Sequence, residues 1–170
     1  MEKDCTRGRP RKPRLLALVL EEDRDTKKQR QADRDRGDGS VAGRVPIESG
    51  PEHKKQIVLV DDELAIREML QSMLRLRGFE ILASLSDGTQ VVDLMNEPVP
   101  KPDVILLDER MPRMSGIEAC KAIHSINPKI PIIFISADES AKERVKEAGA
   151  MAFLQKPISI HELVFLLNSV

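Results

Sequence analysis

The stretch VILLD at residues 104–108 carries the clearest structural signal in the chain. Four apolar residues run directly into an aspartate, and Pro102 and Pro112 bound the segment. A short run that is apolar on both faces is typical of a buried strand in a parallel sheet. We therefore expect Asp108 at the carboxyl end of a central strand, the edge where open α/β sheets place their functional groups.

Similar apolar runs alternate with amphipathic stretches throughout residues 56–170. Strands are expected at 57–60, 80–84, 104–107, 131–135 and 150–154. Helices are expected at 63–77, 87–96, 115–126, 139–148 and from 159 nearly to 170. This (βα)5 pattern predicts an α/β fold, a doubly wound parallel sheet with helices on both faces. The chain order does not set the strand order, but a flavodoxin-like 2-1-3-4-5 sheet puts strands 1 and 3 at its switch point.

Polar side chains follow four of the five expected strands. They are Asp61 and Asp62 after the first strand, Asp108 after the third, Ser136 after the fourth and Lys156 after the fifth. Crowded carboxylates repel one another, and a divalent cation with hard oxygen ligands relieves that repulsion, which indicates Mg²⁺. Asp108 can then attack phosphorus as a nucleophile. Lys156 and the cation would neutralise charge on the phosphoryl oxygens, and Ser136 would hydrogen-bond one of them.

As a set, the motifs of residues 56–170 resemble a response-regulator receiver domain, the CheY-like phosphoacceptor of two-component signalling. The matching residues are Val60-Asp61-Asp62-Glu63, Leu107-Asp108 followed by Met111-Pro112 and Ser115-Gly116, Ile135-Ser136-Ala137, and Lys156-Pro157. They cover the whole domain in the family's order and spacing. The resemblance implies the flavodoxin-like strand order.

The resemblance also implies roles for individual residues. Asp108 takes a phosphoryl group from a histidine kinase or a phosphotransfer protein, Ser136 is the switch hydroxyl and Phe153 fills the position of the switch aromatic. Mg²⁺ is bound by Asp61, Asp62, Asp108 and the backbone carbonyl of Arg110. A downstream protein partner binds the face formed by the fourth helix, the fifth strand and the fifth helix. Because the chain ends with the fifth helix, we expect a stand-alone receiver that acts by binding a partner, or an intermediate in a phosphorelay. We expect it in the cytoplasm.

Two other interpretations use the same residues. A degenerate receiver keeps the fold without being phosphorylated, but it usually lacks one of these groups, and all are present here. A phosphatase using an aspartyl-phosphate needs a second Asp two residues after the nucleophile, where this chain has Arg110. We therefore expect no enzyme activity beyond the autocatalysed transfer to Asp108.

Two positions beside the expected site carry opposite charges. Arg110 lies two residues after the acceptor, and Asp138 lies two residues after Ser136. Our hypothesis is that these side chains pair across the mouth of the site, hinder an attacking water and lengthen the lifetime of the phosphoryl group.

The first 55 residues differ in character from the rest. They carry 15 Lys/Arg and 11 Asp/Glu, against 12 and 17 in residues 56–170. Such a polar composition cannot bury enough apolar area to offset chain entropy, so we expect a disordered leader. Within it, RGRPRKPR at residues 7–14 resembles an AT-hook, a minor-groove reader of A·T-rich DNA. The alternative function is therefore a DNA-associated regulator gated by the receiver, and the simpler interpretation of the leader is a solvated basic tail.

Composition excludes several classes of protein. The two cysteines, Cys5 and Cys120, allow neither a disulfide framework nor a thiolate metal site. No apolar run approaches the length of a membrane span. The apolar run at residues 15–20 follows basic residues, but it is too short for a signal peptide and is followed by acidic residues.

Overall fold

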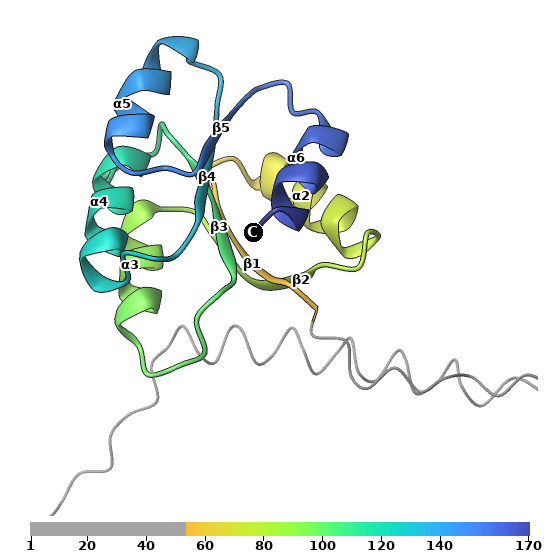
Figure 1. Cartoon of the computed structure of the whole chain (residues 1–170), viewed down its shortest axis with the longest axis horizontal. Helices are drawn as coiled ribbons and strands as arrows, with labels where there is room; N and C mark the ends of the chain where they lie inside the picture. The colour runs from red at the N-terminus through yellow and green to blue at the C-terminus, as the bar shows by residue number, and fades with distance from the viewer. Residues whose placement is uncertain (1–53) are drawn as a thin grey trace, which may run out of the picture. The chain divides into compact units, whose positions relative to one another are not determined.

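A computed structural model describes residues 54–170, and these residues fold around one five-stranded parallel sheet (Figure 1). The strands are β1 (Gln56–Val60), β2 (Glu80–Leu85), β3 (Val104–Asp108), β4 (Ile132–Ser136) and β5 (Ala152–Gln155). Their order is β2-β1-β3-β4-β5, and every pairing is parallel. The expected flavodoxin-like order is confirmed, so β1 and β3 are neighbours.

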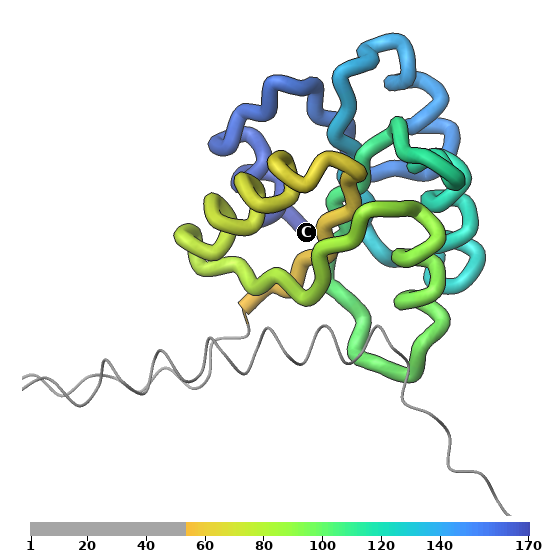
Figure 2. The backbone as a smooth tube through the Cα atoms, turned by 180° about the vertical axis from the view of Figure 1, so that it is seen from behind, coloured from red at the N-terminus to blue at the C-terminus, as the bar shows by residue number. Residues whose placement is uncertain are grey.

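Helices cover both faces of this sheet. They are α2 (Leu64–Arg75), α3 (Gly88–Asn96), α4 (Gly116–Ile126), α5 (Lys142–Glu147), which follows a short 3₁₀ turn η1 (Glu139–Ala141), and α6 (Ile160–Asn168). Helices α2 and α6 lie on one face, and α3, α4 and α5 lie on the other, as Figures 1 and 2 show from opposite sides. The doubly wound layering places all the strand ends that carry polar residues at one edge.

Burial follows from strand position. Every residue of β3 and β4 is buried, whereas the edge strands β2 and β5 each keep exposed or half-buried residues. Central strands of a parallel sheet are covered on both faces, which explains why the run at 104–107 is apolar without alternation.

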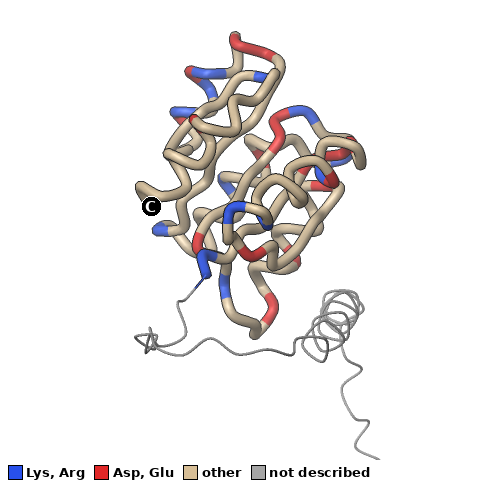
Figure 3. The backbone as a smooth tube through the Cα atoms, turned by 90° about the vertical axis from the view of Figure 1, so that its right-hand side faces the viewer, with Lys and Arg blue, Asp and Glu red and all other residues tan. Residues whose placement is uncertain are grey.

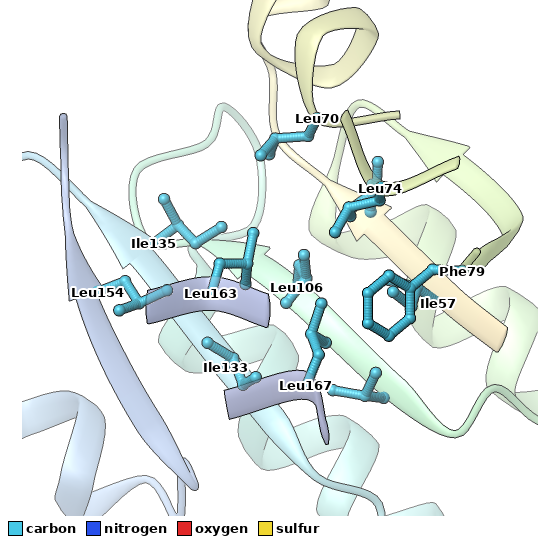
Figure 4. Close-up of a cluster of buried hydrophobic side chains, with 12 residues drawn as sticks. Ile57, Leu70, Leu74, Phe79, Leu106, Ile133, Ile135, Leu154, Leu163 and Leu167 are labelled. Carbon is cyan, nitrogen blue, oxygen red and sulfur yellow. The ribbon is translucent and has the colours of Figure 1, made fainter. Parts of the chain in front are cut away.

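The core on the α2 and α6 side consists of alternate strand residues packed against those two helices (Figure 4). Its buried members are Ile57, Leu59, Leu70, Leu74, Phe79, Val104, Leu106, Ile133, Ile135, Leu154, Leu163 and Leu167. The period of two along each strand and three to four along each helix is the packing pattern of an amphipathic helix on a sheet. This core anchors the strands whose ends build the site.

Side-chain caps fix the starts of several helices. Asp87 caps α3 by accepting from Thr89 N at 2.7 Å, and Ser115 and Glu118 form a complete capping box at α4. The single helix expected at 139–148 is wrong in part, because Asp138 instead caps the 3₁₀ turn and the regular helix begins at Lys142. Strand β4 begins one residue later than expected, since Pro131 has no N–H to donate, and β5 begins two residues later than expected.

Residues 1–53 of the leader lie outside the described residues, and with them the expected disorder, the AT-hook-like segment at 7–14 and the expected DNA contact. Within residues 54–170, Lys and Arg positions are interspersed with Asp and Glu positions (Figure 3). No helix in this part of the chain has the length and apolar character needed to cross a membrane.

Candidate functional site

The carboxyl ends of β1, β3 and β5 bring a lysine between two aspartates. Lys156 Nζ lies 2.9 Å from Asp61 Oδ2 and 2.8 Å from Asp108 Oδ1. Both aspartates are buried, with 4% and 6% of their surface exposed. The expected convergence of these three residues is therefore confirmed in the geometry, and Lys156 forms an ionic bridge between the two carboxylates.

Burial decides the electrostatics of Asp108. It raises the pKa of the Asp108 carboxyl above its ordinary value, and the nearby charge of Asp61 acts in the same direction. The ion pair with Lys156 and the N–H of Arg110, which donates to Asp108 Oδ2 at 2.8 Å, act in the opposite direction. The carboxylate is thus poorly solvated and held in place, as a reactive nucleophile requires.

Lys156 responds to the same surroundings. Burial acts to lower the pKa of its ammonium, but the hydrogen bonds to Asp108 and Asp61 outweigh burial and raise that pKa above its ordinary value. Its backbone N–H donates to Ser136 O at 2.8 Å, which fixes the start of the side chain beside the end of β4. The Lys156 ammonium is therefore held in its charged form and in one position.

The loop after β1 holds Asp61 in a defined orientation. Glu63 N donates to Asp61 Oδ1 at 2.9 Å, and Arg67 Nη1 donates to the Asp61 carbonyl at 2.6 Å. Asp62 is exposed, and no three acidic, imidazole or thiol side chains in the described range enclose a metal-sized space. The residues still fit Mg²⁺, because this ion usually keeps several waters and takes only one or two protein carboxylates. Asp61 and Asp108 supply buried oxygen donors of the required kind.

The β4 end contributes Ser136, and the loop after it contributes Asp138. Ser136 is buried, and its Oγ accepts a hydrogen bond from Asp138 N at 3.1 Å. The Asp138 carboxylate accepts from Arg110 Nη2 at 2.5 Å, so the expected pair at the mouth of the site is present. Hydrogen bonds from Ser140 and Arg110 lower the pKa of Asp138 to about 2. The pair is therefore fully charged at neutral pH.

Two residues beside the acceptor had no role assigned to them from the sequence. Glu109 is buried with 6% exposure, and its carboxylate lies between Arg110 at 3.5 Å and Arg144 at 3.7 Å. A Cβ on Gly116 would stand 2.1 Å from the Asp108 carbonyl oxygen. The charge of Glu109 directly after a buried strand was visible in the sequence. The close approach at Gly116 was not visible, because it depends on how the loop folds back onto β3.

Phe153 lies on β5 in register with Phe134 of β4, and its side chain is half-buried. That position is compatible with an aromatic that changes its exposure. Its switch role stays a prediction, as does the role of the Arg110 carbonyl as a metal ligand.

The family model of the response regulator receiver domain matches residues 57–168. This chain belongs to that receiver family. Its five-stranded order and the placement of Asp61, Asp108 and Lys156 at one sheet edge agree with the assignment. It is accordingly a receiver domain of the kind used in two-component systems.

Two similar curated proteins come from mycobacteria. The chain is 38% identical over 112 residues to the transcriptional regulatory protein PdtaR of Mycobacterium tuberculosis, covering 65% of this chain and 53% of that protein. It is 36% identical to the response regulator MprA of Mycobacterium sp. strain KMS, covering 64% of this chain and 47% of that protein. The chain thus spans about half the length of the curated relatives it matches.

Solved receiver structures have the same fold. Vibrio cholerae chemotaxis protein CheY4 is 29% identical with a TM-score of 0.62, covering 69% of this chain and 98% of that one. CheY of Borrelia burgdorferi, solved as a complex with CheX, BeF3 and Mg²⁺, is 27% identical with a TM-score of 0.63, covering 67% and 87%.

Proposed function

We propose that this receiver domain is a phosphorylation-controlled switch in which Asp108 is the phosphoacceptor. The observation that carries the proposal is the buried Asp108 carboxylate, held by Lys156 Nζ at 2.8 Å and by Arg110 N at 2.8 Å beside a second buried aspartate. A structural carboxylate at a strand end needs none of these surroundings, whereas a phosphoryl transfer site needs a fixed nucleophile and positive charge beside it.

The chemistry is a single displacement at phosphorus. A carboxylate oxygen of Asp108 bonds to phosphorus while the bond from phosphorus to the donor breaks, and the donor leaves with the electron pair as imidazole or acetate. Lys156 stabilises the charge on the transferring oxygens, and the Ser136 hydroxyl is placed to donate to one of them once the group is attached. The donor protein is a histidine kinase or a phosphotransfer protein.

Asp61, Asp62, Asp108 and the Arg110 carbonyl are the proposed ligands of Mg²⁺. When bound, the ion supplies charge neutralisation at the phosphoryl oxygens. Lys156 bridges the buried carboxylates of Asp61 and Asp108 and so holds them close to each other.

Phosphorylation would change the surface used for output. The new group adds charge and three acceptor oxygens, and Ser136 would release its bond from Asp138 N to reach it. We propose that this shifts the population of conformations at α5, β5 and α6, with Phe153 moving inward. On these elements Phe165 is 73% exposed, which gives a downstream protein partner an apolar contact. The chain turns over no external substrate in this scheme.

The proposal is tested by incubating the full chain with Mg²⁺ and acetyl phosphate and measuring its intact mass. We expect a gain of one phosphoryl group in the wild type, no gain in Asp108→Asn, and no gain when EDTA removes the metal. An equal gain in Asp108→Asn would refute Asp108 as the acceptor.

The Arg110–Asp138 pair is expected to lengthen the life of the phosphoryl group. Arg110→Ala removes the guanidinium of the pair, and Asp138→Asn keeps the cap on Ser140 while removing the charge that holds Arg110. We expect each variant to lose the group about three- to tenfold faster, because partial access of water lowers the barrier only modestly. The measurement is the decay of the phosphorylated mass after the donor is removed.

The pH dependence of this effect has a defined sign. The pKa of Asp138 is lowered to about 2, so the ion pair is fully formed at pH values above the ordinary pKa of aspartate. It is lost only as the pH falls toward the lowered pKa. The ratio of wild-type and Asp138→Asn decay rates should therefore be constant between about pH 6 and 8. Identical decay rates in wild type and both variants would disprove the role of the pair.

A further inference from the structure

The loop at residues 109–115 joins β3 to α4 and carries the Arg110 carbonyl, one of the proposed Mg²⁺ ligands. Near its end, Met114 N donates to the Pro112 carbonyl at 2.9 Å, which closes a γ-turn around Arg113. Arg113 has a φ of +68°, and no other non-glycine residue in the described range 54–170 has a positive φ. A long side chain disfavours this conformation, so other contacts must hold the turn.

One of these contacts is an ion pair to the neighbouring helix. Arg113 Nε donates to Asp87 Oδ2 at 2.9 Å, and Asp87 is fully buried at the N-terminus of α3. The other oxygen, Oδ1, accepts from both N and Oγ1 of Thr89 at 2.7 Å. Burial acts to raise the pKa of Asp87, but the hydrogen bonds from Thr89 and Arg113 outweigh it and lower that pKa. The carboxylate is therefore charged. Helix capping uses only Oδ1, so Oδ2 is available to accept from Arg113.

Close packing supports the ion pair. A Cβ on Gly88, the first residue of α3, would stand 2.9 Å from both Cγ and O of Met114. The absence of a side chain at Gly88 thus lets the loop lie directly on the first turn of α3. The loop is fixed at its start as well, because Gly116 N donates to the Glu109 carbonyl at 2.9 Å.

We propose that Arg113 and Asp87 are positioning residues for the Mg²⁺ site, which hold the 109–115 loop so that the Arg110 carbonyl is presented to the cation. The inference rests on the proposed function, since it concerns a ligand of that site. Neither residue is among the proposed ligands. They act through the backbone of the loop, as outer-shell partners act on metal ligands elsewhere.

The sign of the effect separates this role from simple electrostatics. Removing a positive side chain from the neighbourhood of a cation site should by itself strengthen cation binding. Removing a residue that positions a ligand should weaken it. Arg113→Asn is the informative variant, because Asn tolerates a positive φ and so removes the guanidinium without adding backbone strain.

The test is calorimetric titration of Mg²⁺ into the full chain at fixed ionic strength. We expect Arg113→Asn to bind Mg²⁺ about tenfold more weakly than the wild type, in line with other outer-shell substitutions. Arg113→Lys should recover most of the affinity by restoring a cation to Asp87. Lys142→Asn removes an exposed cation from α5 and is the charge-matched control, with affinity unchanged or slightly higher.

Asp87→Asn provides a second approach if Arg113→Asn folds poorly, because Asn caps a helix as well as Asp does. It should also weaken Mg²⁺ binding, and the Asp87→Asn, Arg113→Asn double variant should be no weaker than the more affected single variant. Affinity of Arg113→Asn equal to or above that of the wild type would overturn the inference, as would additive losses in the double variant. A wild type that binds no Mg²⁺ would instead refute the proposed site itself.

Discussion

Lys156→Met is expected to lose both stability and phosphoryl uptake. The substitution leaves Asp61 and Asp108 buried beside each other without the ammonium that lies within 2.9 Å of each. Removing one partner of a buried ion pair typically costs about 3–5 kcal/mol in the free energy of unfolding. Phosphoryl uptake should fall by about 100-fold or more, because the transferring oxygens lose a fixed positive charge.

The stability loss is measured by urea denaturation followed by far-UV circular dichroism, since the chain has neither Trp nor Tyr. Lys142→Met, at an exposed position on α5, is the matched control and should change the free energy of unfolding by less than about 0.5 kcal/mol. In the wild type, the raised pKa of Lys156 means that its contribution persists below the ordinary lysine range and is lost only at higher pH. A Lys156→Met protein as stable as the Lys142→Met control would contradict the proposed ionic bridge.

Gly116→Ala is the second substitution with a large expected effect. Its Cβ would lie 2.1 Å from the Asp108 carbonyl oxygen and 2.9 Å from Phe134 Cε1. Both neighbours belong to fully buried strands, so neither can move away easily. We expect the free energy of unfolding to fall by about 3 kcal/mol or more. The fraction of Gly116→Ala that folds should take up phosphoryl groups more slowly than the wild type, because the loop beside Asp108 must shift.

Gly78→Ala is the matched control for this experiment. Gly78 has a φ of +88°, and an added Cβ there meets nothing within 4 Å. The cost is then only that of the left-handed conformation, about 1 kcal/mol, with phosphoryl uptake unchanged. Equal losses for the two variants would show that backbone conformation, and not the close approach to Asp108, explains why residue 116 is glycine.

Much of the fold followed from local sequence pattern, and the strand order did not. The apolar run before Asp108 and the periodicity of 63–77 are sufficient to predict a buried strand and an amphipathic helix. Nothing in the chain order distinguishes one parallel arrangement from another, so the 2-1-3-4-5 order came from the family resemblance. The 3₁₀ turn at Glu139–Ala141 was missed because it is capped by the Asp138 side chain, which accepts a hydrogen bond from Ser140 N. The apolar periodicity of the sequence does not reveal such a side-chain bond to the backbone.

The site shows the same division. Asp61, Asp108 and Lys156 were predictable because parallel strands present their carboxyl ends at one edge. The Arg113–Asp87 pair was not predictable, because it depends on a positive φ that an arginine rarely adopts. The burial of Glu109 likewise depends on how the loop after β3 packs.

The most direct test of the account is the position of the phosphoryl group in the chain. Borohydride reduces an acyl phosphate to an alcohol, which converts a phosphorylated aspartate to homoserine and a phosphorylated glutamate to the next longer alcohol. After incubation with acetyl phosphate and Mg²⁺, tandem mass spectrometry of the peptide spanning β3 should find homoserine at position 108. Modification at Glu109, at Asp61 or outside the 56–170 domain would contradict the central claim that Asp108 is the phosphoacceptor.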